Sequence, residues 1–359
     1  MGKGENNFQD EIRGDGRIPC LVVEADCLAE ATHKAIIACY RNGIYVETPK
    51  QRPDMTLGRD ADMTIVVKNP DAEPKICIPG IHDDGRGVLQ YVLEVTHGIH
   101  NHWKKTPEHP EFWGYTYNER VVDQLPFVLA RIKHDWEKTK GQWGQGIGRI
   151  TGRDYQFTTW RPGEDIVLEQ DDPPCWQSGR LRFLRNSKGE IVMNYQTEWR
   201  SRDLLKAWNE NNIGQVELMK LLGAKVSNML EVPINLGSYI DRSSSLHLYG
   251  LYFDRDGLED KIMDMEESHW SDRTLDSRDY MTMQPDMTDI PWPATIEAQK
   301  RLIAAQMQRE KETGTMNASR RELVNAGYDL EKFPYPAEWD TWPKSWDAEP
   351  DPTKLARVL

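Results

Sequence analysis

A single cysteine and the polar side chains that follow it form the part of the chain with the clearest chemical potential. Cys175 ends the run DDPPC, in which two prolines restrict the backbone and help to fix the direction of the thiol. A thiolate is a good nucleophile at neutral pH when its pKa is lowered, and a nearby arginine lowers it. Arg200 lies in the run WRSRD (199–203). Cys175 is therefore a candidate nucleophile, and Arg200 is a candidate for the arginine that would act on it.

Each of these residues also has a plainer explanation. Cys175 could be a small buried hydrophobic residue, as most lone cysteines are. Arg200 and Ser201 could form a solvated strand end. Asp203 could cap the helix that follows, and Asn211 could be a buried polar residue that hydrogen-bonds to backbone. The order of the motifs decides between these explanations.

Five short motifs occur in a fixed order between residues 158 and 249. They are TTW, DDPPC ending at Cys175, WRSRD, Asn211 eight residues after Asp203, and SLHLY ending at Tyr249. This order and most of the spacings resemble the thymidylate synthase family, which includes pyrimidine nucleotide (dUMP, dCMP) hydroxymethylases. The match covers roughly a quarter of the chain, and YTYNERVVDQL (115–125) extends it.

The resemblance implies a folate-dependent enzyme that adds a one-carbon unit to C5 of a pyrimidine nucleotide, using 5,10-methylenetetrahydrofolate. C5 of a pyrimidine becomes nucleophilic only after addition at C6, and a thiolate both attacks and leaves easily. The residues implied are Cys175 as nucleophile, Tyr117 near it, Arg200, Ser201 and Arg153 on the phosphate, Asn211 on the base, His247 and Tyr249 on the sugar, and Asp203 on the folate.

The resemblance also implies a homodimer in which Arg153 binds the phosphate of the neighbouring subunit. The chain departs from the family pattern at several positions: Asp154 replaces a second arginine, and Trp176 follows the nucleophile where many synthases have histidine. Strict spacing from Gly98 places Tyr91 where the family has a proton-relay glutamate, and Glu94 is the nearest carboxylate. A match of Arg52 to a further phosphate arginine is too thin to use.

Asn211 predicts a uracil base, because a carboxamide offers one donor and one acceptor to N3–H and O4. The departures favour a dUMP 5-hydroxymethylase. The alternatives are a thymidylate synthase, a dCMP or CMP hydroxymethylase, and an inactive relative that acts as a scaffold through its Trp-rich tail (Trp339, Trp342, Trp346). A metal site remains a rival from another class, built from His82, Asp83, Asp84, His97, His100 and His102, but it has no diagnostic spacing. We therefore expect no metal.

Composition limits the kinds of partner. The chain has 359 residues and a formal net charge of −13, so a polyanionic nucleic acid is not expected to bind its whole surface. The first residues lack the apolar core of a signal peptide, and no apolar stretch is long enough to span a membrane. Five cysteines at irregular spacing suggest reduced thiols in the cytoplasm.

The resemblance implies an α/β (α+β) fold, with one catalytic domain built on a large mixed sheet and a long buried helix. Strands are expected at 18–25, 63–70 and 155–160, with a hairpin that turns at 186–189. Helices are expected at 28–40, 122–136 and 295–312, and at 204–222, where apolar residues on nearly all sides argue for burial. The chain divides into a mobile arm (1–17), a catalytic domain (18–253) and a C-terminal extension of unknown role (254–359).

Overall fold

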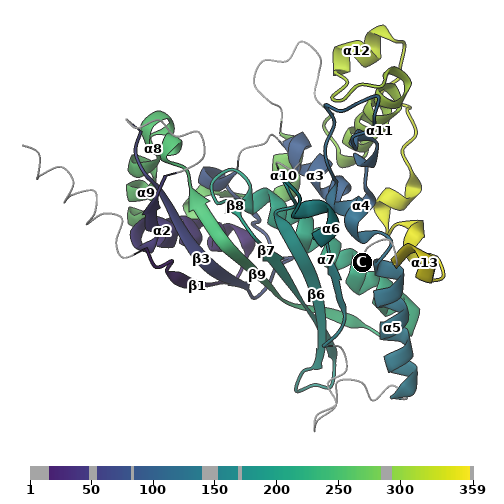
Figure 1. Ribbon diagram of the computed structural model, residues 1–359, viewed down its shortest axis with the longest axis horizontal. Helices are drawn as coiled ribbons and strands as arrows, with labels where there is room; N and C mark the ends of the chain where they lie inside the picture. Colours follow the sequence, from purple (N-terminus) through teal and green to yellow (C-terminus); the bar gives the residue numbers. More distant parts are fainter. Residues whose placement is uncertain are drawn as a thin grey trace, which may run out of the picture.

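The computed structural model describes residues 16–47, 55–81, 85–139, 153–168, 172–283 and 293–355. Its centre is a large mixed sheet (Figure 1). The strands run in the order β1 (Cys20–Ala25), β3 (Gly58–Val67), β9 (Ile234–Leu248), β7 (Ile191–Trp199), β6 (Trp176–Arg185) and β5 (Gln156–Thr158). Two short strands join the path: β2 (Ile44–Val46) pairs with β3, and β8 (Arg202–Asp203) pairs with β9. This confirms the predicted fold class.

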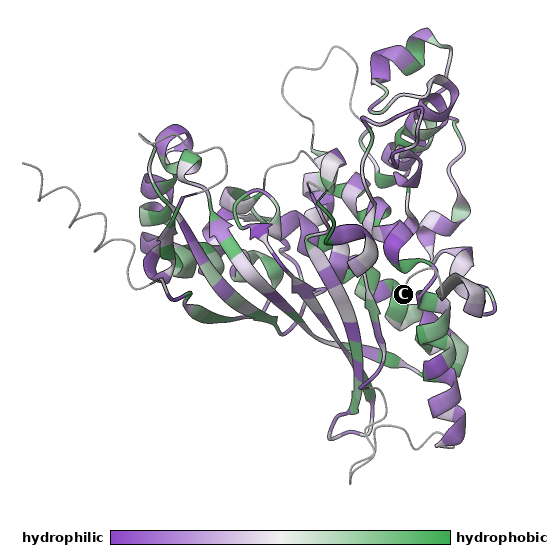
Figure 2. Cartoon of the chain, in the orientation of Figure 1, coloured by the Kyte–Doolittle hydropathy of each residue, from purple (hydrophilic) through white to green (hydrophobic). Residues whose placement is uncertain are grey.

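The pairing is parallel between β1 and β3 and between β9 and β7, and antiparallel elsewhere along the main path. Burial alternates along each strand, as in β7, where every second residue from Ile191 to Trp199 is buried. The same alternation is visible in the colours of the strands in Figure 2. One face of the sheet is therefore covered, and the other is open.

Four helices cover the buried face: α2 (Leu28–Asn42), α3 (Gly85–His97), α5 (Leu125–Lys138) and α7 (Trp208–Leu230). The helix α7 lies against β9 and is flanked by α2, α3 and α5. Its buried residues are spread around its circumference, which confirms the prediction of a long buried helix. Residues 88–96 lie in the helix α3.

Local sequence explains several element boundaries. The hairpin between β6 and β7 turns at 186–189 as predicted, with Gly189 at φ +80, a conformation that glycine adopts without strain. The strand expected at 63–70 begins earlier, because Gly58 to Asp62 extend its pairing with β9 and β2. Three parts of the sequence lie wholly or mostly outside the described residues. They are the expected arm (1–17), Arg52 and the glycine-rich segment 141–152, for which we expect a flexible loop.

The residues after 250 wrap around two sides of this layer (Figure 1). The helices α8 (Gly250–Asp256) and α9 (Leu258–Glu267) lie near α2 and β3, and β10 (Thr274–Leu275) pairs with β4 (Ile76–Cys77). The chain continues through α10 (Ser277–Thr282), α11 (Ile296–Thr313), α12 (Arg320–Asn325), the 3-10 turns η4 (Ala337–Asp340) and η5 (Lys344–Asp347), and α13 (Pro352–Leu355). The remaining short helices are α4 (Tyr117–Val121) and α6 (Pro162–Asp165).

The extension shares the main hydrophobic core. Ile303, Trp339 and Trp346 belong to the same buried cluster as the sheet and α7, and Trp339 and Trp346 are 7% and 2% exposed. These tryptophans pack the extension against the domain, which argues against a tail held out to bind a partner. Within the described ranges, no helix is long and apolar enough to cross a membrane.

Candidate active site

The ends of two neighbouring strands bring Cys175 and Arg200 together. Cys175 directly precedes β6 and Arg200 directly follows β7, and the first residues inward, Trp176 and Trp199, are paired. The backbone N–H of Arg200 donates to the carbonyl oxygen of Cys175 at 2.8 Å. The sheet thus places the two residues side by side, as the sequence predicted.

The guanidinium of Arg200 holds the loop that carries the thiol. It donates to the carbonyl oxygens of Pro174 at 3.2 Å and Pro173 at 2.6 Å, and lies 3.5 Å from the Asp172 carboxylate. Because Arg200 remains half-exposed, part of its donor capacity is available to a phosphate.

Burial dominates the titration of the Cys175 thiol. It raises the pKa of Cys175 above its ordinary value of 9.0, while Arg200 and, more weakly, Arg202 lower it and Asp172 raises it. The expectation of a lowered pKa is therefore wrong for the protein alone. The arginines do act in the expected direction, but they are outweighed by desolvation.

Two tyrosines lie beneath the nucleophile. The Tyr117 hydroxyl accepts a hydrogen bond from the backbone N–H of Trp176 at 3.4 Å, and its ring packs edge-on against Trp176 and Trp199. Tyr115 packs against Tyr117, with ring centroids 5.6 Å apart. Burial raises the pKa of both Tyr115 and Tyr117, so their hydroxyls remain protonated at neutral pH.

The short strand β8 aligns a second group of predicted residues. Asp203 is paired with His247 across β8 and β9, and the His247 ring lies edge-on to Tyr249 at 4.7 Å. Burial lowers the pKa of His247, although Asp203 and Asp60 oppose the shift, so the imidazole is neutral at pH 7. Burial raises the pKa of Tyr249, and Asp203 and Cys175 add to the shift.

The Asp203 carboxylate is already held by the protein. One oxygen accepts from the backbone N–H groups of Leu205 and Lys206 at 2.9 and 3.0 Å, and the other accepts from the Tyr252 hydroxyl. The plainer explanation of Asp203 is thus partly correct, because the side chain caps the turn before α7. A carboxylate has about four acceptor sites, so a bound ligand could still donate to it.

A buried polar network joins β7, β8, β9 and α7 beneath the site. The Arg202 side chain, 2% exposed, is paired with Asp241 and donates to Ser243 at 3.0 Å and to Asn212 at 3.3 Å. Asp241 also accepts from Thr197 and from the Trp208 indole, both at 2.9 Å. A buried charge needs such partners, and here they fix the start of α7 to the sheet.

Asn211 lies in the first turn of α7, the part of the helix that the buried polar network holds against the sheet. The side chains of Asn211 and Ser201 are half-buried, and neither makes a hydrogen bond to another described residue. Asn211 is therefore not the satisfied buried amide of the plainer explanation. Its carboxamide is free to donate and accept hydrogen bonds to a ligand.

Arg153 does not join the cluster within one chain. It is exposed and lies before β5. Tyr155, which directly precedes β5, accepts at its carbonyl oxygen from the N–H of Leu181 in β6. Extending this pairing puts Arg153 level with Phe183, eight residues along β6 from Cys175. At about 3.3 Å per residue, this is roughly 26 Å. At this separation, Arg153 does not reach the Cys175 of its own chain.

The proton-relay position carries a tyrosine on the site-facing side of α3. The Tyr91 hydroxyl is buried and has no hydrogen-bond partner among the described residues, and its electrostatic neighbours include Glu94, Arg202 and Tyr115. Glu94 is paired with His100 at 3.0 Å.

The histidines of the rival metal site serve the fold instead. His97 donates to carbonyl oxygens of Glu338 and Thr341, while His100 and His102 pair with different carboxylates, Glu94 and Glu310. Among the residues that the structure describes, no group of histidine, cysteine or acidic side chains could hold a metal ion. His82, Asp83 and Asp84 lie outside those residues.

Sequence reasoning missed three residues of the site: Tyr115, which packs on Tyr117, Arg202, which lowers the pKa of Cys175, and Tyr252, which donates to Asp203. The signals were present, since Tyr115 begins the matched segment 115–125, Arg202 lies within WRSRD, and Tyr252 follows Tyr249 by three residues. Their roles depend on burial and pairing across strands, which spacing alone does not report.

Comparison with known proteins finds a similar protein. A protein of Methanothermobacter thermautotrophicus (strain Delta H), named "Putative thymidylate synthase", is 27% identical to the chain over 144 residues. The chain resembles thymidylate synthases. The aligned part is 39% of this chain and 53% of the relative, so the match spans about half of the relative's length. No family model matches the chain.

Solved thymidylate synthases are also among the similar structures. Thermostable thymidylate synthase A from Bacillus subtilis superposes with a TM-score of 0.45 and 11% identity, covering 74% of this chain and 100% of that one. The thymidylate synthase of T4 phage gives a TM-score of 0.41 and 13% identity, over 66% of this chain and 80% of that one.

Proposed function

We propose that the chain is an enzyme that transfers a one-carbon unit from 5,10-methylenetetrahydrofolate to C5 of a pyrimidine nucleotide. The nucleotide we propose as its substrate is dUMP. The observation that carries the proposal is the position of Cys175 directly before β6, beside Arg200 and next to Trp176, whose backbone N–H donates to the Tyr117 hydroxyl. A thiolate there would add to C6 and make C5 a nucleophile.

The surrounding residues fit a nucleotide and a folate. Arg200 and Ser201 would bind the phosphate, and Asn211, without a partner in the described chain, would bind the uracil edge. His247 and Tyr249 lie together and would hold the sugar hydroxyl. Asp203 retains acceptor sites for the folate ring, and the neutral tyrosines 115 and 117 would hold protons near the thiol.

We also propose a homodimer. The open face of the sheet includes half-buried or exposed side chains from four strands, and a shallow hollow of about 200 Å³ lies on it, lined in part by Arg180, Arg182 and Ile240. Pairing of two such faces would cover these side chains. The distance of Arg153 from its own Cys175 suits a role in the neighbour's site.

For the product, we favour hydroxymethylation over methylation. Methylation needs hydride transfer in a closed, dry site, whereas hydroxymethylation needs a water beside the new carbon. The unpartnered Tyr91 hydroxyl, in a position where spacing expected a glutamate, could hold such a water. This choice is tested separately from the transfer itself.

The test is mass spectrometry of products after incubation with methylenetetrahydrofolate and each of dUMP, dCMP, UMP and CMP. Addition of a hydroxymethyl group to dUMP, with tetrahydrofolate released, is the expected result. Dihydrofolate formed mole for mole with a methylated product would instead make the enzyme a thymidylate synthase. No modified nucleotide in any mixture would contradict the proposal of transfer.

A further inference from the structure

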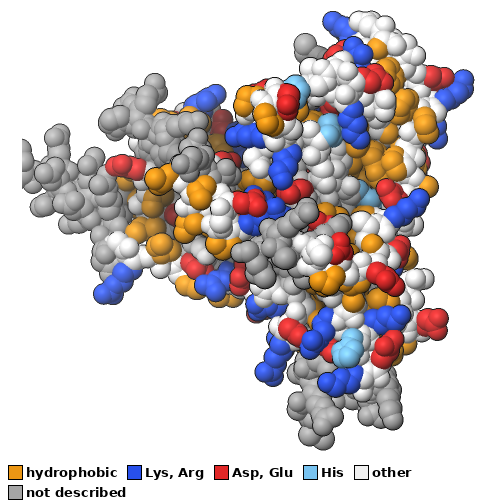
Figure 3. Space-filling model, turned by 45° about the vertical axis from the view of Figure 1, so that its right-hand side comes forward, with side chains coloured by type: hydrophobic (Ala, Val, Ile, Leu, Met, Phe, Trp, Pro, Cys, Tyr) orange, Lys and Arg blue, Asp and Glu red, His pale blue; other side chains and the backbone are white. Residues whose placement is uncertain are grey.

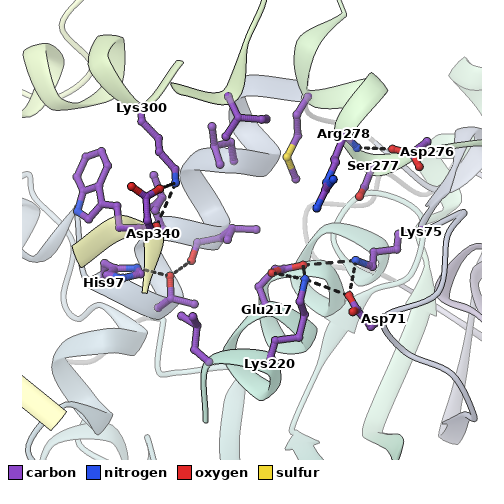
Figure 4. A pocket seen from close by; sticks show the side chains of 18 of the residues that line it. Asp71, Lys75, His97, Glu217, Lys220, Asp276, Ser277, Arg278, Lys300 and Asp340 are labelled. Atoms are coloured by element: carbon purple, nitrogen blue, oxygen red, sulfur yellow. Dashed lines mark hydrogen bonds and ion pairs between the residues drawn. The ribbon is translucent and has the colours of Figure 1, made fainter. Parts of the chain in front are cut away.

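A cavity of about 520 Å³ lies away from the cysteine site, between the catalytic layer and the C-terminal extension (Figure 4). One wall is formed by α3, α7 and the segment 71–75, and the other by α10, α11 and η4. None of the predicted site residues lines it. The cavity exists only because the extension folds back onto the domain, and its volume suits a small organic molecule.

The inner surface of this cavity is apolar. It is formed by aliphatic residues of α3 and α7 and by side chains of the extension: Leu89, Val92, Leu93, Leu221, Met281, Ile296 and Trp339. Trp339 offers a flat ring, and Met281 an adaptable thioether. Such a surface favours a ligand with a flat apolar body.

The three lysines that line the cavity already form ion pairs with carboxylates. Lys75 is within 3.0–3.5 Å of Asp71, Glu73 and Glu217, and Lys220 lies 3.0 Å from both Asp71 and Glu217. On the other wall, Lys300 pairs with Asp340 at 2.6 Å. Asp276 caps α10, accepting from the backbone N–H of Arg278 at 2.8 Å.

Arg278 is different. Its guanidinium is exposed at the rim and extends into the cavity from α10, as Figure 4 shows. It makes no ion pair or side-chain hydrogen bond with another described residue. Among the described residues that line the cavity, Arg278 is therefore the cation without a paired carboxylate. Every lining carboxylate, in contrast, has a partner.

We propose that this cavity binds a small organic monoanion, a carboxylate with a flat apolar body that lies against Trp339 and Met281 and accepts from Arg278. One unpaired arginine matches one carboxylate in the bidentate geometry that guanidinium favours. A dianion such as a phosphate monoester fits less well, because Arg278 supplies one positive charge and the three lining lysines are already in ion pairs. This inference is independent of the proposed function.

Binding would connect two parts of the chain that are distant in sequence. The ligand would contact α3 and α7 on one side and α10 and α11 on the other. A ligand that binds only the folded protein raises the midpoint of thermal unfolding with concentration. Stabilisation is therefore a readout that does not require catalytic activity.

The experiment uses the full chain with 1-naphthaleneacetate as the probe and its neutral amide, 1-naphthaleneacetamide, as the matched ligand. Isothermal titration and the thermal midpoint are measured for the native chain, Arg278→Gln, Arg278→Lys and the control Arg255→Gln, which changes an exposed arginine of α8 away from the cavity. The acid should bind saturably and at least about tenfold more tightly than the amide.

Arg278→Gln should remove that tenfold preference, Arg278→Lys should keep part of it, and Arg255→Gln should leave it unchanged. Leu93→Trp, which fills the cavity from α3, should weaken both ligands. Failure of the acid to bind saturably, equal binding of acid and amide, or an unchanged preference in Arg278→Gln would each overturn the proposal.

Discussion

At the scale of single residues, the Cys175 thiol is governed by opposing effects. Desolvation raises its pKa above 9.0, Arg200 lowers it, and Asp172 raises it. A thiol with a raised pKa is mostly protonated at pH 7, so its reactivity increases as the pH rises above 9. In the proposed mechanism, only the thiolate fraction adds to C6.

This balance predicts the direction of two substitutions. Asp172→Asn should lower the pKa of Cys175, because it removes a nearby negative charge, and Arg200→Gln should raise it. The measurement is the rate of Cys175 alkylation by iodoacetamide between pH 7 and pH 10, with the product located by peptide mass spectrometry. Asp62→Asn, which changes a carboxylate elsewhere on the sheet, is the control. Shifts in the opposite directions would mean that these charges do not act on the thiol.

Asn211 sets the base preference in the proposed function. Asn211→Asp should move preference from dUMP towards dCMP, since a carboxylate accepts from the cytosine amino group but cannot donate to uracil O4. We expect the ratio of kcat/KM values for the two nucleotides to change by at least about tenfold. The control for this substitution is Asn235→Asp, because Asn235 is exposed on β9. Asn209→Asp is a poor control, because the Asn209 side chain hydrogen-bonds to the backbone of Lys75 and Cys77. A native enzyme that prefers dCMP would refute the assignment.

At the scale of elements, strand ends and one buried network position the site. The β6 and β7 ends hold Cys175 beside Arg200, β8 aligns Asp203 with His247, and the network around Asp241 fixes α7. The sequence predicted the hairpin of β6 and β7 and the buried helix α7, because alternating and helical apolar patterns are local. It could not predict that Arg202 lies under the site, because that depends on pairing between β8 and β9.

The network predicts a large loss of stability on removing its central charge. Asp241→Asn should destabilise the fold by about 3–5 kcal/mol, since it leaves the buried Arg202 guanidinium without its counter-charge. Urea unfolding followed by tryptophan fluorescence measures this. The matched Asp62→Asn removes the more exposed pair with Arg242 and should cost about 0–1 kcal/mol. Equal losses in the free energy of unfolding for the two substitutions would show that the buried network stabilises the fold no more than an exposed ion pair does.

At the scale of the whole molecule, the sheet leaves one face open and the extension closes around the other side. Positive and negative side chains are interspersed over the face seen in Figure 3, as expected for a chain whose net charge is spread rather than gathered. The extension had no recognisable motif, so its packing through Trp339 and Trp346 was not predictable from the sequence. The division at residue 254 stays a prediction.

The proposed homodimer predicts complementation between two inactive chains. Arg153→Ala and Cys175→Ser should each abolish most activity, but mixed dimers should recover part of it, because one hybrid site has both native residues. Refolded mixtures with differently tagged chains provide the measurement, after isolation of the heterodimer. A monomer at micromolar concentration, or inactive heterodimers, would contradict the shared site.

The central claim is that Cys175 drives one-carbon transfer to C5. Its most direct measurement is tritium release from dUMP labelled at C5, in the presence of methylenetetrahydrofolate, by the native chain and by Cys175→Ser. The native chain should release tritium, and Cys175→Ser should release it at least about 10³-fold more slowly while still binding the nucleotide. Comparable release by both proteins would contradict the account.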